Sequence, residues 1–193
     1  MNTNFRYIII LLLANLLFLS SEANGQNLSP ASGEINGHQW VDLGLPSGLK
    51  WATCNVGAST PEDPGDYFAY GEVSEKDSYV FNNSINLKKE IRHISGRSEY
   101  DAATVHWGKE WRIPTYHEVD ELVYNCKMEW TTINGKNGYK LTSLINGASI
   151  FLPATGLVDG TQPEFTQECG WYWYSGFEDP IASEEPPYAP SFT

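Results

Sequence analysis

Short apolar runs separated by turn residues dominate the first third of the chain. Residues 38–43 (HQWVDL) and 49–56 (LKWATCNV) flank the turn sequence Gly-Leu-Pro-Ser-Gly at 44–48. Two β-rich runs on either side of a Pro-Ser-Gly turn predict a hairpin. We expect Trp40 and Trp51 to lie close together across this hairpin and to begin the core.

A short helix is predicted after a long polar stretch. Asp101 is a good N-cap for a helix that runs through Trp107, and Gly108 provides its end. Residues 111–113 are expected to be extended, because Pro114 disfavours a helical conformation in the residue before it.

A second, amphipathic helix is predicted directly afterwards. Thr115 and Glu118 match the capping box, in which the hydroxyl and the carboxylate each take one free amide of the first turn. The apolar residues that follow recur at i, i+3, i+4 and i+7, which is one stripe of a helix. They are Val119, Leu122, Val123 and Cys126.

The last third of the chain predicts strands. Residues 137–143 and 148–152 flank Asn146-Gly147, and this dipeptide is the strongest short hairpin signal. Residues 170–175 (GWYWYS) predict one more strand, with tryptophans on one face and tyrosines on the other. Exposed rings would stack on sugars or grip proteins, whereas a strand covered on both faces would belong to the core. Both interpretations of this strand, as a binding surface and as part of the core, remain open at this point.

The two ends of the chain differ in composition from the middle. Residues 1–23 predict a secretory signal, with Arg6 before the apolar run 7–19. That run is shorter than the roughly 20 residues of a membrane-spanning helix, so no span is expected. We expect a flexible leader over 24–36, one domain over 37–176, and a poorly ordered acidic, proline-rich tail over 177–193. The mature protein is then exported, to the periplasm, the outer surface or the medium.

The charge is strongly acidic. The formal net charge is −12, and no Lys or Arg follows Lys140. Such a chain repels nucleic acid and anionic membranes, which excludes both as partners. The acidic residues indicate solubility; a calcium site is the alternative, although no EF-hand spacing is present. No other cofactor or metal is expected.

Catalytic motifs are scarce. The chain has no G-x-S-x-G motif, no Walker loop and no dinucleotide fingerprint. Two carboxylate pairs, Asp63 with Asp66 and Glu118 with Glu121, have the residue types of a glycosidase, but the capping box already explains Glu118. Three cysteines without a C-x-x-C spacing leave either one disulfide or three free thiols.

A set of segments in fixed order resembles the Fibrobacter succinogenes major paralogous (FISUMP) domain of exported proteins from gut and rumen Bacteroidota-like bacteria. The match covers about residues 38 to 175. Its segments are 39–48 (QWVDLGLPSG), 51–57 (WATCNVG), 65–72 (GDYFAYGE), 100–103 (YDAA), 107–108 (WG), 111–115 (WRIPT), 137–140 (NGYK), 149–153 (SIFLP) and 170–173 (GWYW).

The resemblance implies an α+β, C-type-lectin-like fold, with a small twisted antiparallel sheet, two helices and long loops. The WRIPTxxE piece at 111–118 is also similar to formylglycine-generating and C-type-lectin-like domains. Such domains often carry cysteines where Cys54 and Cys126 lie, which implies a disulfide between them. Domains of the family continue through two further strands, so the chain is expected to be incomplete at its C-terminal end. The first hairpin would then keep an exposed edge or gain a partner strand.

The family has no established enzymatic activity and is associated with surface modules. We therefore expect a non-catalytic, exported binding or adhesion module whose partner is a glycan or a protein at the cell surface. The expected ligand-binding residues are Trp171, Tyr172, Trp173, Asp159 and Glu164, and no catalytic residue is expected. One alternative is an enzyme, either a carboxylate-pair glycosidase or a formylglycine-generating-type oxidase. The oxidase needs a late thiol pair, of which only Cys169 is present. The other alternative is a truncated, inactive paralogue.

Overall fold

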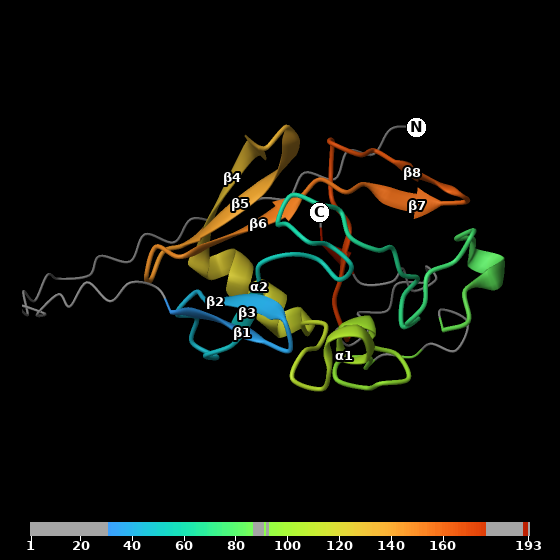
Figure 1. Ribbon diagram of the computed structural model, residues 1–193, viewed down its shortest axis with the longest axis horizontal. Helices are drawn as coiled ribbons and strands as arrows, with labels where there is room; N and C mark the ends of the chain where they lie inside the picture. Colours follow the sequence, from blue (N-terminus) through green and yellow to red (C-terminus); the bar gives the residue numbers. More distant parts are fainter. Residues whose placement is uncertain (1–30, 87–90, 92, 177–190, 193) are drawn as a thin grey trace, which may run out of the picture.

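The computed structural model describes residues 31–86, 91, 93–176 and 191–192 (Figure 1). The signal predicted over 1–23 and most of the predicted leader and tail lie outside these residues. The fold is mixed α+β, and the strand pairs of its sheets are antiparallel. One three-stranded sheet has the order β1 (Ser32–Ile35), β2 (His38–Asp42), β3 (Lys50–Ala52), and another has the order β4 (Cys126–Ile133), β5 (Lys136–Ser143), β6 (Ser149–Pro153). Two further pairs are β7 (Leu157–Asp159) with β8 (Gln162–Glu164) and β9 (Tyr172–Trp173) with β10 (Ser191–Phe192).

The first sheet contains the predicted hairpin and one unexpected strand. The hairpin is formed by β2 (His38–Asp42) and β3 (Lys50–Ala52). The unexpected strand is β1 (Ser32–Ile35), so the predicted flexible leader is wrong for these residues. The reason is the Asn36-Gly37 turn, whose φ angles of 54° and 81° match the tight hairpin turn that this dipeptide favours.

The two hairpin tryptophans do not meet, which corrects the expectation that they begin a common core. Trp40 is paired with Ala52 and Val41 with Trp51, and directly opposite residues share a face of the sheet. Trp40 therefore points to one face and Trp51 to the other. Trp51 packs against the main core, and Trp40 against a smaller cluster around Trp107.

Both predicted helices are confirmed. The first, α1 (Ala102–Trp107), is capped by Asp101, whose Oδ1 accepts from the Thr104 amide at 3.0 Å. The second, α2 (Tyr116–Asn125), has the capping box of Thr115 and Glu118. Its predicted stripe is buried at three positions, whereas Val123 at the stripe's edge is 38% exposed.

The second sheet contains the other predicted hairpin, made of β5 (Lys136–Ser143) and β6 (Ser149–Pro153). It is extended by β4 (Cys126–Ile133), which sequence analysis missed because Cys126 also ends the helical stripe. The Asn134-Gly135 turn between β4 and β5, with φ angles of 48° and 80°, carries the same hairpin signal as Asn36-Gly37.

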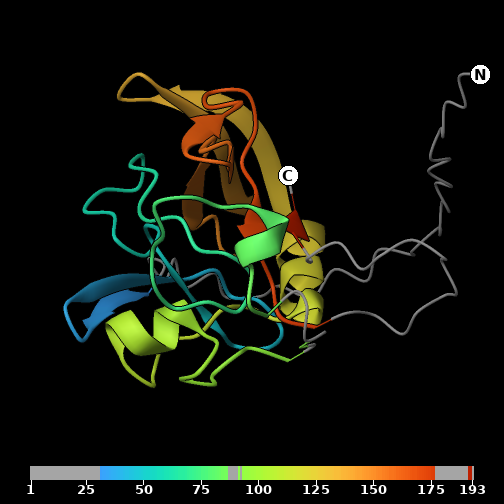
Figure 2. The same ribbon diagram turned by 90° about the vertical axis from the view of Figure 1, so that its right-hand side faces the viewer.

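The main core lies where α2 and the two three-stranded sheets meet (Figure 2). Its buried residues come from β2, α2, β4, β5, β6 and the segments between β2 and β3 and between β5 and β6. They are Val41, Leu43, Leu45, Leu122, Cys126, Leu141, Ala148 and Ile150. Residues that are more than 80 positions apart in the chain thus share one apolar centre, which fixes the two sheets relative to α2.

The implied disulfide is not formed: Cys54, Cys126 and Cys169 are all free. The environments of the two expected partners differ. Cys126 is buried in the main core, while the Cys54 thiol donates within its own loop to the Ala58 carbonyl, at 3.6 Å. Among the described residues, no helix is long and apolar enough to cross a membrane.

Candidate aromatic ligand pocket

The strand predicted over 170–175 is shorter than expected. Only β9 (Tyr172–Trp173) is regular, and it pairs with β10 (Ser191–Phe192), which lies within the tail that we expected to be poorly ordered. The alternation of the side chains is nevertheless present. Trp171 and Trp173 line a pocket, while the Tyr172 hydroxyl donates to the Pro153 carbonyl at 2.6 Å.

The pocket has a volume of about 300 Å³ and is dominated by aromatic side chains. Six rings line it: Tyr67, Phe68, Tyr70, Tyr79, Trp171 and Trp173. Its volume is at the small end of the range of ligand pockets, about 300–1,000 Å³. The pocket therefore suits a small ligand, or one or two units of a larger one.

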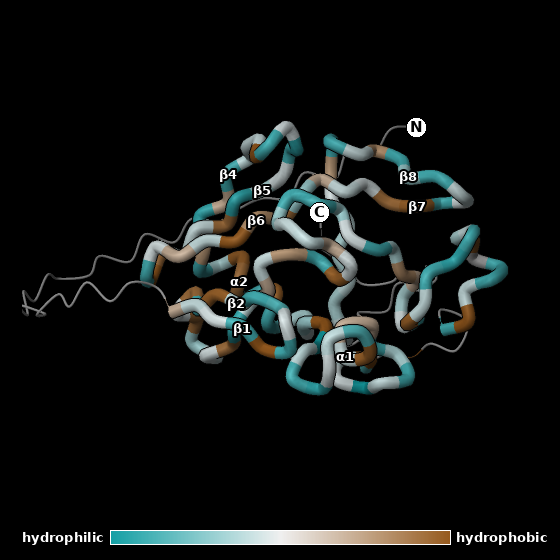
Figure 3. The backbone as a smooth tube through the Cα atoms, in the orientation of Figure 1, coloured by the Kyte–Doolittle hydropathy of each residue, from teal (hydrophilic) through white to brown (hydrophobic). Residues whose placement is uncertain are grey.

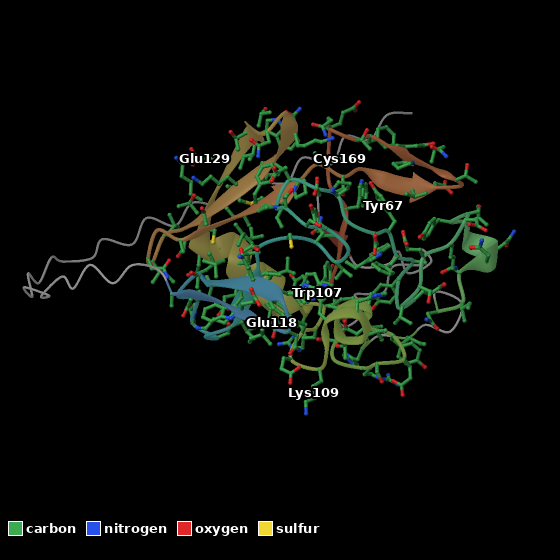
Figure 4. The ribbon with its side chains drawn as sticks, viewed as in Figure 1. Tyr67, Trp107, Lys109, Glu118, Glu129 and Cys169 are labelled. Carbon is green, nitrogen blue, oxygen red and sulfur yellow. The ribbon has the colours of Figure 1, made fainter. Side chains whose placement is uncertain are left out.

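Separate segments of the chain build the walls. The loop 67–70 and the loop 79–84, which contains the short helix η1 (Phe81–Asn83), supply two of them. Another comes from β7 (Leu157–Asp159), which pairs with β8 (Gln162–Glu164). In Figure 3, β7 stands out as an apolar stretch, and Figure 4 places Tyr67 beside it.

Backbone hydrogen bonds join these walls. The amide of Tyr79 donates to the Gly160 carbonyl at 2.6 Å, and the Gly160 amide donates back at 2.7 Å. Lys76 donates through its amide to the Tyr79 hydroxyl at 3.0 Å. The loop that carries Tyr79 is thus attached to the turn between β7 and β8, and its ring is held at the pocket.

The polar tips of the pocket's rings are held by backbone carbonyls. The Tyr67 hydroxyl donates to the carbonyl of Thr155 at 2.6 Å, and the Trp173 indole N–H donates to the carbonyl of Phe68 at 2.7 Å. The Tyr79 hydroxyl donates to the carbonyl of Tyr67. Such bonds fix the rings before any ligand arrives, which lowers the entropic cost of binding.

The phenols of the pocket are neutral at physiological pH. Burial raises the pKa of Tyr67, and burial raises the pKa of Tyr70 to about 12, partly offset by a backbone hydrogen bond from Gly176. Trp171 differs from the other rings in being 45% exposed, so part of its surface is open to an incoming molecule.

The five residues expected to bind the ligand separate into two groups. Trp171, Trp173 and Asp159 come together at the pocket. Tyr172 lies outside the lining of this pocket and lines an adjoining cavity of about 240 Å³, to which Trp171, Trp173 and Asp66 also contribute. Glu164 lies exposed on β8, outside the lining of the pocket, so its role in binding stays a prediction.

Four pocket residues were not expected from the sequence: Tyr67, Phe68, Tyr70 and Tyr79. The first three lie in the segment 65–72, which entered only through the family resemblance, and Tyr79 lies in the long polar stretch before the first helix. The available signal was three aromatic residues within four positions, in a segment without strand periodicity. Such a density of rings outside regular structure is typical of a binding surface.

The acids near α2 have structural partners. Arg112 binds Glu118 with two hydrogen bonds, of 2.7 and 2.6 Å, and the Thr115 amide donates to the same carboxylate at 2.7 Å. Burial raises the pKa of Glu118, but these bonds and the Arg112 charge outweigh it and hold the pKa below 4.5. Glu121 accepts from the Ser47 amide and hydroxyl at 2.9 and 2.5 Å.

These bonds bear on the expected glycosidase alternative. A catalytic carboxylate pair needs one acid with a raised pKa, to protonate the leaving group. The pKa of Glu118 is shifted in the opposite direction. Glu121, on α2, accepts its hydrogen bonds from Ser47 in the turn before β3. Within the described residues, no group of three His, Cys, Asp or Glu side chains gathers to hold a metal ion, so the calcium alternative gains no site there.

No protein-family model matches this sequence, and comparisons with curated proteins and with solved structures give no match either.

Proposed function

We propose that the protein is an exported, non-catalytic recognition module that binds a glycan or a protein at the cell surface through the aromatic pocket. The observation that carries this proposal is the convergence of six rings, from separate segments of the chain, on one cavity. Aromatic rings offer large apolar faces at low conformational cost, and that is what a binding surface needs. Export rests on the signal expected over residues 1–23.

We also propose that the domain has a C-type-lectin-like arrangement and belongs with the FISUMP domains. The ordered set of motifs between residues 38 and 175 supports this assignment. The helix α2 between two small antiparallel sheets, together with the long loops that form the pocket, is compatible with it. The pocket itself is argued from its own residues and does not depend on the family.

The proposal is tested with Trp171→Ala and a matched control, Trp130→Ala. Both tryptophans are 45% exposed, but Trp130 lies on β4 outside the pocket, where it packs against Tyr139. The wild-type protein is screened against glycan and cell-surface protein panels, and the affinity for each bound ligand is then measured by titration calorimetry. Loss of a stacking ring weakens binding by a factor of about ten or more.

The expected result is weaker binding for Trp171→Ala and unchanged binding for Trp130→Ala. A blank result for the folded wild-type protein on both panels would overturn the proposed function. Equal loss in the two variants would place the binding surface elsewhere.

A further inference from the structure

The charged side chains that line the aromatic pocket indicate which class of ligand it binds. Among its lining residues the only charged side chain is Asp159, at the end of β7. The rest of the polar lining is neutral, including Asn83, Ser84 and the protonated tyrosines. We infer that the pocket binds neutral sugar units and rejects their acidic counterparts, such as uronic acids; this inference rests on the proposed function.

The ring surfaces favour a sugar. The carbon face of a pyranose ring is flat and apolar, and it stacks on an open aromatic face. Trp171 lines the pocket and is 45% exposed as a whole residue, and we infer that part of its ring is available for such stacking. The hydroxyls at the edge of the sugar ring then need acceptors. The carboxylate of Asp159 accepts two of them in charge-assisted bonds, which are stronger than neutral ones.

The lysine near the pocket does not supply a compensating positive charge. The ammonium of Lys76 donates to the Asn83 carbonyl at 2.8 Å. The same ammonium forms an ion pair with Glu72 at 2.6 Å, and both side chains are largely buried. A ligand carboxylate at the pocket would therefore face Asp159 with no free cation in the lining to balance it.

Electrostatics sets the size of the expected selectivity. Asp159 is exposed, so its carboxylate and a ligand carboxylate repel each other largely through water. Two like charges about 4 Å apart in water repel enough to weaken binding about fivefold. An acidic sugar is therefore expected to bind about fivefold more weakly than the neutral sugar of the same stereochemistry. Peptide ligands with basic side chains would also pair with the Asp159 carboxylate, but their recognition does not require aromatic rings on several walls of the pocket.

The test uses short oligosaccharides of glucose, galactose and mannose, each compared with the oligosaccharide of the matching uronic acid. Affinities are measured by titration calorimetry for the wild-type protein, Asp159→Asn and Glu164→Gln. Glu164→Gln is the matched control, because it removes the same charge from the same hairpin at an exposed position outside the pocket.

The expected result is binding of at least one neutral oligosaccharide and about fivefold weaker binding of its acidic counterpart. Asp159→Asn should reduce this difference to less than twofold, while Glu164→Gln should leave it as in the wild type. Equal affinity for the two members of a pair, or an equal response in the two variants, would overturn the inference but leave the recognition module intact. Binding of proteins and of no oligosaccharide would overturn the sugar class alone. No binding of either kind would overturn the proposed function as well.

Discussion

At the residue scale, Glu118 shows how one side chain can serve several contacts. It closes the capping box of α2 and binds Arg112 through two hydrogen bonds, which ties the helix start to the extended segment before it. Sequence analysis predicted the capping box from the Thr115–Glu118 spacing. The Arg112 pairing was not predictable, because it depends on how residues 112–114 turn back onto the helix.

Glu118→Gln should lower the free energy of unfolding at pH 7 by about 1–2 kcal/mol, from the loss of a cap bond and a half-buried ion pair. The folded pKa lies below 4.5, so this stabilisation is present above the unfolded pKa and is lost as the pH falls through the folded pKa. The difference between wild type and variant should therefore shrink below about pH 4.

Urea denaturation at pH 7 and at pH 3.5 measures this difference. Glu129→Gln is the control, because it breaks an exposed ion pair with Lys127 on β4. If the two variants lose equal stability at pH 7, the carboxylate of Glu118 has no special structural role.

At the element scale, turns explain both the successes and the failures of prediction. The hairpins around 44–48 and 146–147 were predicted because an apolar run lies on each side of the turn. β1 and β4 were missed although Asn-Gly follows each of them. β1 is mostly exposed and shows no apolar alternation, whereas β4 alternates apolar and polar residues over 126–130 but begins at Cys126, which also fits the helical stripe. The residues of a turn can be recognised in a short segment of sequence, but whether an exposed segment forms a strand depends on the strand with which it pairs.

The approach of β6 to β5 depends on Gly138. A Cβ atom there would lie 2.3 Å from the Leu152 carbonyl oxygen and 2.6 Å from the ring of Phe151. Gly138→Ala should therefore lower the free energy of unfolding by at least about 2 kcal/mol. Gly135→Ala is the matched control: its position is open, and it adds only the cost of a positive φ, about 1 kcal/mol. Thermal and urea unfolding of the two variants measure the difference, and a smaller loss for Gly138→Ala would contradict the close approach.

At the scale of the whole molecule, the pocket exists only because distant segments converge. The aromatic strand near Trp171 pointed to the region of this pocket, since alternation along a strand is local. The contribution of Tyr67 and Tyr79 was not predictable, because the Tyr79–Gly160 bridge joins segments about 80 residues apart. The charge of Asp159 was noted in the sequence, but its isolation among neutral groups appears only in the folded chain.

The most direct test of the pocket uses the seven tryptophan indoles as reporters. Their ¹⁵N–H signals are assigned with single Trp→Phe variants and followed during titration with a ligand found in the panels. We expect the signals of Trp171 and Trp173 to shift with the ligand, while those of Trp40, Trp51, Trp107, Trp111 and Trp130 stay in place. A shift of Trp107, which lines the adjoining cavity but not the pocket, or shifts confined to Trp130, while binding is measured independently, would contradict binding in the pocket.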